Sequence, residues 1–116
     1  MEKEKTDRYK IVITASAETF FYQVVEYLYE HMSIERAEEV ATNIQELALS
    51  LGQLHQRGTA EKKLVHRKKS YRYILFERTA RAQIKIIYYV DEAAKTVYVT
   101  DFFPTEKNPR KLLRNR

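Results

Sequence analysis

The chain contains no cysteine, and only two glycines and two prolines occur among its 116 residues. The absence of cysteine excludes a disulfide framework, thiolate metal sites and a cysteine nucleophile, and it is typical of the reducing cytoplasm, where we expect this protein. With so few glycines and prolines, long flexible linkers are not expected. The first ten residues are rich in charge, and no apolar stretch long enough for a signal peptide or a membrane span follows them. We therefore expect no association with a membrane.

Several motifs that identify enzymes are also missing. The sequence has no glycine-rich phosphate loop, no metal-ligand spacing and no Gly-x-Ser-x-Gly motif. Its acidic residues are spread along predicted helix surfaces, and no pair of them is placed like the two carboxylates of a glycosidase. We therefore expect neither a metal nor an organic cofactor.

The charges that are present are separated along the chain. Residues 14–51 include seven acidic residues and one basic residue, a net charge of −6, whereas residues 62–85 include nine basic residues and one acidic residue, a net charge of +8. Residues 107–116 add five basic residues and no acidic one. Such asymmetry indicates a face that meets polyanions such as nucleic acid, and the alternative is a solvated surface that happens to be rich in lysine.

The first half of the chain predicts a strand and two helices. Residues 10–14 are rich in β-branched side chains and predict a strand. Ser16 is expected to cap a helix that ends near residues 31–32, and Ser33 is expected to cap a second helix with a long apolar stripe. Gly52 is the expected end of that second helix. The short link between the helices predicts an antiparallel helical hairpin.

The second half of the chain predicts strands. Residues 53–70 are polar and without period, which predicts a basic loop, and afterwards the apolar pattern changes to a period of two. The predicted strands span residues 71–76, 84–90 and 97–103, and their short connections predict an antiparallel meander. We therefore predict an α+β fold in a single domain, residues 1–116, with an N-terminal strand and an antiparallel helical hairpin packed on a small, mainly antiparallel β-sheet.

Four segments carry a resemblance to a known family. They are YKIVIT at residues 9–14 with Ala17 and Glu18, SIERA at 33–37, YRYIL at 71–75 with IKIIYYV at 84–90, and residues 97–103 followed by NPRKLL at 108–113. In their order and spacing, these segments resemble the RelE/ParE superfamily of bacterial toxins over about residues 9–113. The last segment is similar to a family pattern in which the final strand leads to Asn-Pro-x-Lys-Leu.

The resemblance implies a toxin of a type II toxin–antitoxin system, held inactive by a cognate antitoxin. RelE-like members cut messenger RNA in the ribosomal A site without a metal, and ParE-like members poison DNA gyrase. The partners implied are therefore an antitoxin, together with the ribosome and its mRNA or with gyrase. An antitoxin of this kind is expected to be a short, partly disordered segment, acidic where it crosses a basic face. Phe102 and Phe103 are candidate anchors for it, although we expect one of the two in the core.

Metal-free RNA cleavage needs a group that removes a proton, charge that stabilises the phosphate, and a group that protonates the leaving oxygen. The resemblance points to Lys85, Arg81 and Arg78 as catalytic candidates. Lys85 stands where the family most often has arginine, and lysine offers phosphate a single point charge where arginine offers two hydrogen bonds. Strand alternation places it on the same face as Ile87 and Tyr89. The expected nucleic-acid-binding residues are Lys62, Lys63, Arg67, Lys68, Lys69 and Lys107.

The sequence also departs from the family pattern. Glu106 stands where relatives commonly have an arginine after the last strand, and no histidine is nearby. His66, in the basic loop, is a candidate general acid or base. The alternative is that it is a solvent-exposed loop residue without a catalytic role. Tyr73, Tyr89 and Tyr98 could stack on a base or pack the sheet. The sequence therefore leaves three functions open: a ribosome-dependent endoribonuclease, a ParE-like gyrase inhibitor without catalysis, and a binding module without toxicity.

Overall fold

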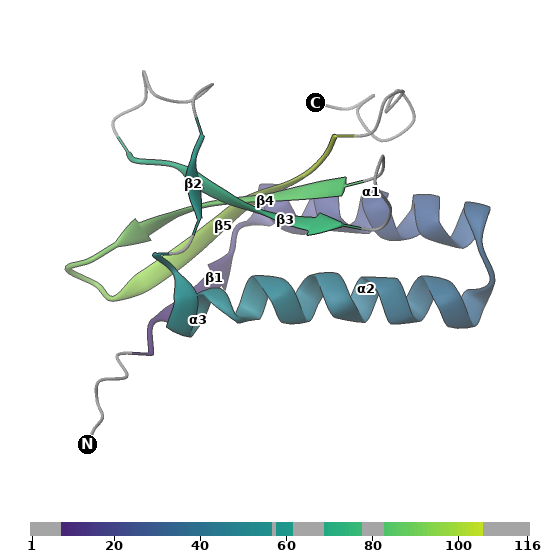
Figure 1. Ribbon diagram of the computed structural model, residues 1–116, viewed down its shortest axis with the longest axis horizontal. Helices are drawn as coiled ribbons and strands as arrows, with labels where there is room; N and C mark the ends of the chain where they lie inside the picture. Colours follow the sequence, from purple (N-terminus) through teal and green to yellow (C-terminus); the bar gives the residue numbers. More distant parts are fainter. Residues whose placement is uncertain (1–7, 57, 62–68, 78–82, 106–116) are drawn as a thin grey trace.

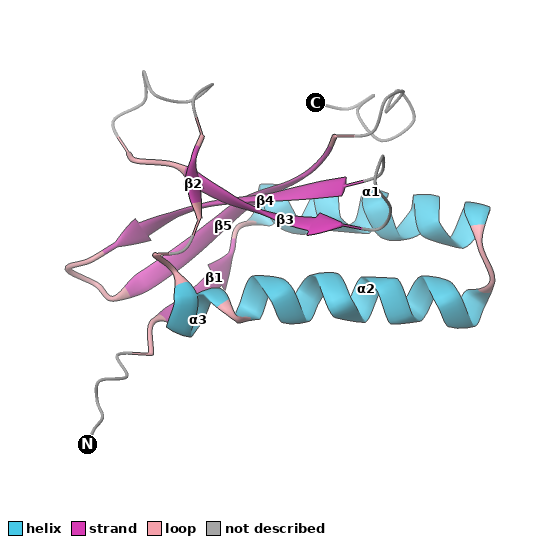
Figure 2. Cartoon of the chain, in the orientation of Figure 1, coloured by secondary structure: helices cyan, strands magenta, loops and turns pink. Residues whose placement is uncertain are grey.

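The computed structural model describes residues 8–56, 58–61, 69–77 and 83–105. These form an α+β fold in which two long helices accompany a five-stranded, mostly antiparallel sheet (Figures 1 and 2). In chain order the elements are β1 (Lys10–Ile13), α1 (Ala15–His31), α2 (Ile34–Leu49), α3 (Leu51–Leu54), β2 (Thr59–Ala60), β3 (Arg72–Glu77), β4 (Gln83–Asp91) and β5 (Thr96–Pro104). The coarse prediction of an α+β fold with a helical hairpin is confirmed.

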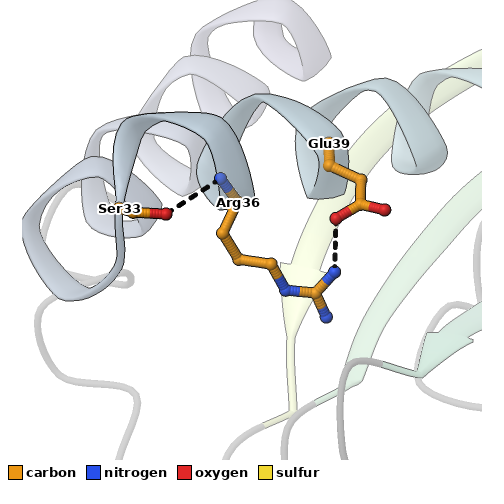
Figure 3. A network of polar contacts seen from close by, with 3 residues as sticks. All are labelled: Ser33, Arg36 and Glu39. Atoms are coloured by element: carbon orange, nitrogen blue, oxygen red, sulfur yellow. Dashed lines mark hydrogen bonds and ion pairs between the residues drawn. The ribbon is translucent and has the colours of Figure 1, made fainter.

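Both long helices begin at side-chain caps. Helix α1 is capped by Thr14, whose hydroxyl accepts a hydrogen bond from the backbone N–H of Ala17 at 3.2 Å, so the prediction of Ser16 as the cap was wrong by two residues. Both residues are good caps, and Thr14 prevails because its extended backbone continues β1 directly. Ser33 caps α2 as predicted, since its hydroxyl accepts from the N–H of Arg36 (Figure 3).

One turn into α2, the guanidinium of Arg36 donates to the carboxylate of Glu39 at 2.7 Å (Figure 3). Both side chains are more than half exposed. A pair of this kind contributes a few tenths of a kcal/mol, about 0.3–0.5. The capping hydrogen bond of Ser33 therefore matters more for the start of this helix than the ion pair does.

The prediction that Gly52 ends α2 was wrong. Helix α2 ends at Leu49, and Ser50 turns the chain into α3, which contains Gly52. Neither glycine of the chain has a positive φ, so Gly52 does not serve as a left-handed helix cap. The absence of a side chain on Gly52 instead allows the backbone of Tyr9 to approach closely. The carbonyl of Gly52 accepts a hydrogen bond from the N–H of Tyr9 at 2.7 Å, and a β-carbon on Gly52 would lie 2.9 Å from the carbonyl oxygen of Tyr9.

The strand order in the sheet is β1-β5-β4-β3-β2. Strands β3, β4 and β5 form the predicted antiparallel meander, and β1 lies parallel to β5 at the edge, with Lys10 paired to Thr96. The other edge is the two-residue strand β2, which pairs with β3 inside the region that the sequence predicted to be a loop. A register shift between Ile87 and Tyr88 marks a β-bulge in the β4–β5 ladder.

A single core fills the space between the helical hairpin and one face of the sheet. The helices contribute an apolar stripe at helical spacing, and the strands contribute alternate residues, among them Ile74, Ile86, Val99 and Phe102. Phe102 is buried and Phe103 is half-buried, as expected for one of the two in the core. Because alternate residues face the helices, the remaining side chains of β3, β4 and β5 point the other way, and we call this side the outer face.

Candidate nucleic-acid interface

Lys85 lies on the outer face of β4, as strand alternation predicts. Its neighbours Ile84 and Ile86 are buried in the core, which fixes the direction of the side chain between them. The ammonium group of Lys85 lies 4.4 Å from the centre of the Tyr73 ring on the adjacent strand, a distance suited to a cation–π interaction. Lys85 is thus held over the sheet rather than extended into solvent.

The acidic partner of Lys85 is Glu61, a residue that was not predicted from the sequence. The ammonium group donates to the Glu61 carboxylate at 2.7 Å, with side-chain exposures of 21% for Lys85 and 5% for Glu61. The backbone N–H of Glu61 donates to the carbonyl of Tyr71, which fixes this carboxylate beside β3. A carboxylate buried to this degree needs a cationic or hydrogen-bonding partner, because an unpaired charge is costly to bury. The feature of the sequence that could have indicated this ion pair is the position of Glu61, a lone acidic residue directly before a run of basic ones.

Three tyrosines form a second cluster on the outer face. The rings of Tyr89 and Tyr98 stack across β4 and β5 with centroids 5.0 Å apart, and Tyr71 meets Tyr89 edge-on at 5.4 Å. The ammonium group of Lys69 lies 5.0 Å from the centre of the Tyr89 ring. Aromatic rings with a cation above them form a surface on which a nucleobase can stack. The same rings also contribute to the packing of the sheet.

The structure places two of the nine predicted site residues. Lys85 and Lys69 both lie at the outer face, but each is positioned by a different group of tyrosines. Tyr89 lies four positions beyond Lys85 on β4, which corresponds to about 13 Å along a strand. The other candidates lie outside the described residues: Arg78, Arg81, Lys62, Lys63, Arg67, Lys68 and Lys107. Their grouping into one site stays a prediction.

The described strands nevertheless fix where two of the basic segments attach. Residues 78–82, which include Arg78 and Arg81, are joined to Gln83, and residues 106–116 are joined to Thr105. The backbone N–H of Thr105 donates to the carbonyl of Gln83 at 2.9 Å. Both segments therefore attach to the sheet at one point, at the end of the meander that also carries Lys85.

The histidines offer little to this interface. His66 lies outside the described residues, and His31 is exposed at the end of α1. His55 is buried, stacks on Tyr9 with ring centroids 4.0 Å apart, and has no hydrogen-bond partner at either ring nitrogen among the described residues. Its carbonyl accepts from the hydroxyl of Tyr88, an inner-face residue, so His55 belongs to the core side of the sheet.

Two further searches concern the described residues alone. No group of three or more histidine, aspartate or glutamate side chains among them is arranged to hold a metal ion. None of the described helices has the length and apolar character needed to cross a membrane.

No protein-family model matches this chain, and no curated protein or solved structure is detectably similar to it.

Proposed function

We propose that this chain is a toxin of the RelE/ParE type that acts on messenger RNA at the ribosome and is neutralised by an antitoxin. The observation that carries the proposal is the outer face, where the ammonium group of Lys85, the buried carboxylate of Glu61 and four tyrosines lie on neighbouring strands or directly beside their ends. The order of elements on which the family resemblance depends, a strand, a helical hairpin and a meander, also occurs in this fold. The RelE/ParE-like arrangement is part of the proposal.

The chemistry of the outer face suits a single-stranded polyanion. Stacking of bases on tyrosines tolerates any sequence, and lysines supply charge for the phosphates. In the proposed reaction the 2′-hydroxyl of a ribose loses its proton and attacks the adjacent phosphate, the bond from that phosphate to the 5′ oxygen of the next nucleotide breaks, and the 5′ oxygen takes up a proton. Lys85, with Arg78 and Arg81, stabilises the charge that develops on the phosphate. Lys85 must then exchange the Glu61 carboxylate for a phosphate oxygen, because one ammonium group cannot serve both anions fully.

The same contact favours a second candidate function. A lysine whose charge is balanced by a buried carboxylate is a weaker catalytic group than an unpaired one. Binding without catalysis, as in a ParE-like inhibitor of DNA gyrase, needs no such group. The pairing of Lys85 with Glu61 therefore keeps gyrase inhibition as the alternative.

Induced expression in bacteria tests both functions at once. We expect translation to stop and transcripts to be cut inside reading frames when the 5′ ends of RNA are mapped. Lys85→Ala should remove the cuts, whereas Lys10→Ala, which deletes an equal charge from an exposed position on β1, should retain them. Intact transcripts with double-strand breaks in DNA would support the gyrase alternative, and normal growth without any antitoxin would contradict both.

A further inference from the structure

A groove opens in the helical hairpin, close to the N-terminus of α1 and the C-terminus of α2. Its volume is about 280 Å³, and most of the surface that lines it is apolar. Phe21, Ala48 and Phe102 are buried residues that line it, and Ile13 and Leu49 are lining residues that remain 38% and 58% exposed. The groove lies on the helical side of the protein, away from the outer face.

Three of the seven large apolar side chains that are exposed among the described residues line this groove: Ile13, Tyr22 and Leu49. Tyr22, on α1, also lines it and is 61% exposed. Tyr22 and Tyr29 are seven residues apart on α1, so both point to the same side of the helix, and Tyr29 is 45% exposed. An apolar side chain that inserted between Tyr22 and Leu49 would remove both from water, and each large side chain buried at an interface favours binding.

The charges of the hairpin define the chemistry of an occupant. Helices α1 and α2 carry seven glutamates, all exposed, and their only arginine or lysine is Arg36, which is paired with Glu39. Glu18 is the one charged residue that lines the groove. Farther along the hairpin the hydroxyl of Tyr29 donates to Glu38 across the two helices, and the pKa of Tyr29 is raised by loss of hydration and by the charge of Glu38. The groove therefore lies in an acidic surface.

We infer that the groove between α1 and α2 binds a cationic amphipathic helix of a partner protein. Apolar residues of that helix would enter between Tyr22 and Leu49, and its lysines or arginines would face Glu18 and the neighbouring glutamates. An antitoxin that covers the basic segments is expected to be acidic, whereas the partner that we infer for the groove is basic. The groove and the outer face lie on different sides of the sheet, so both can be occupied together, and the inference does not depend on the proposed function.

A matched pair of peptides tests the inference. The probe is a synthetic helical peptide with leucines at positions i, i+3, i+4 and i+7 and lysines beside them, labelled for fluorescence anisotropy, and the comparison peptide has glutamates in place of the lysines. The protein carries a net charge of +5, so its overall charge attracts the glutamate peptide. We expect the lysine peptide to bind about tenfold more tightly nonetheless. Equal binding, or tighter binding of the glutamate peptide, would overturn the inference.

Two variants of exposed residues on α2 locate the binding. Leu49→Ser should weaken binding of the lysine peptide about tenfold, a fold-change typical of an interface anchor. Ile34→Ser is the matched control, since Ile34 is 63% exposed at the opposite end of the helix, and it should leave binding unchanged. Circular dichroism checks that both variants remain folded. Equal losses in the two variants would overturn the inference.

Two further measurements separate the other possible occupants. If light scattering gives the mass of a dimer that Leu49→Ser converts to a monomer, a second copy fills the groove, and the inference of a cationic partner is wrong. Leu49→Ser should bind a labelled single-stranded RNA oligonucleotide as tightly as the unaltered protein does. A loss of RNA affinity in this variant would show that the two ligands share one surface, and it would overturn the inference while leaving the proposed function standing.

Discussion

The substitution Glu61→Gln tests whether the buried carboxylate withholds Lys85 from polyanions. Gln keeps the size of the side chain and an oxygen that can accept from the ammonium group, but it removes the negative charge that lies 2.7 Å away. Lys85 remains over the Tyr73 ring and is then an uncompensated cation on the outer face. We therefore expect this variant to be less stable and to bind single-stranded RNA more tightly.

The size of each effect follows from the exposure of the pair. Exposed ion pairs contribute about 0–1 kcal/mol, whereas breaking a buried pair costs about 3–5 kcal/mol. Glu61 is 5% exposed and Lys85 is 21% exposed, so solvent screens the pair in part, and the free energy of unfolding should fall by about 1–3 kcal/mol. One additional phosphate contact with a single strand steepens the dependence of log K on log salt by about 0.7, which corresponds to about fivefold tighter binding at 0.1 M salt.

Fluorescence anisotropy with a labelled single-stranded RNA, repeated over a range of salt concentrations, measures the affinity and its slope, and urea unfolding measures the stability. Glu46→Gln is the matched control, because it removes the same charge from an exposed position on α2. The double variant Glu61→Gln with Lys85→Ala should lose the gain in affinity. If Glu61→Gln and Glu46→Gln had the same affinity for RNA and the same salt slope, Glu61 would not compete with phosphate for Lys85.

Three further substitutions test the fold around these surfaces. Tyr88→Phe should lower the free energy of unfolding in urea by about 1–3 kcal/mol, because the buried hydroxyl donates to the carbonyl of His55 at 2.7 Å and its loss leaves that group unsatisfied. Ser33→Ala should lower it by about 1 kcal/mol through the lost cap of α2, as measured in the same assay. Glu38→Gln should lower the pKa of Tyr29 towards its ordinary value in an NMR titration of the tyrosine rings, since the carboxylate contributes to its raised value. Because that pKa is raised in the folded protein, any stability linked to Tyr29 is present below the pKa of the unfolded chain, about 10, and is lost as the pH rises through the folded value.

Each of these three has a result that contradicts it. Unchanged stability of Tyr88→Phe would mean that another donor replaces the hydroxyl. Unchanged stability of Ser33→Ala would mean that water caps the helix equally well. If Tyr29 had the same pKa in Glu38→Gln as in the unaltered protein, the Glu38 carboxylate would not be a cause of the raised pKa.

The sequence predicted the regular elements well because their apolar periods are long and unbroken. The three strands of the meander differ from the predicted bounds by one residue at each end. Sequence rules failed at the ends of the helices, where Thr14 and Ser16 are equally acceptable caps, and where Gly52 serves a close backbone contact with Tyr9 rather than a turn. These choices depend on the tertiary neighbours of each residue, which no local pattern contains.

The candidate site was harder to predict than the fold. Alternation along β4 correctly placed Lys85 on the face opposite Ile86. It could not predict the pairing with Glu61, because β2 is only two residues long and carries no strand pattern of its own. An isolated acidic residue beside a basic segment appears in a sequence to be a solvated charge, and only the packing of β2 against β3 makes Glu61 a buried ligand of Lys85.

The place of β1 beside β5 has a consequence for how the protein is made. Within the sheet, β1 has one neighbour, and that neighbour is β5, the last of the described strands to leave the ribosome. Until then, the apolar stripes of α1 and α2 have no complete sheet to cover, and nascent chains that expose such surfaces are prone to aggregate or to bind chaperones. Because pairing between distant parts of a chain slows folding, translation that stalls before Thr96 should leave a product that proteases remove.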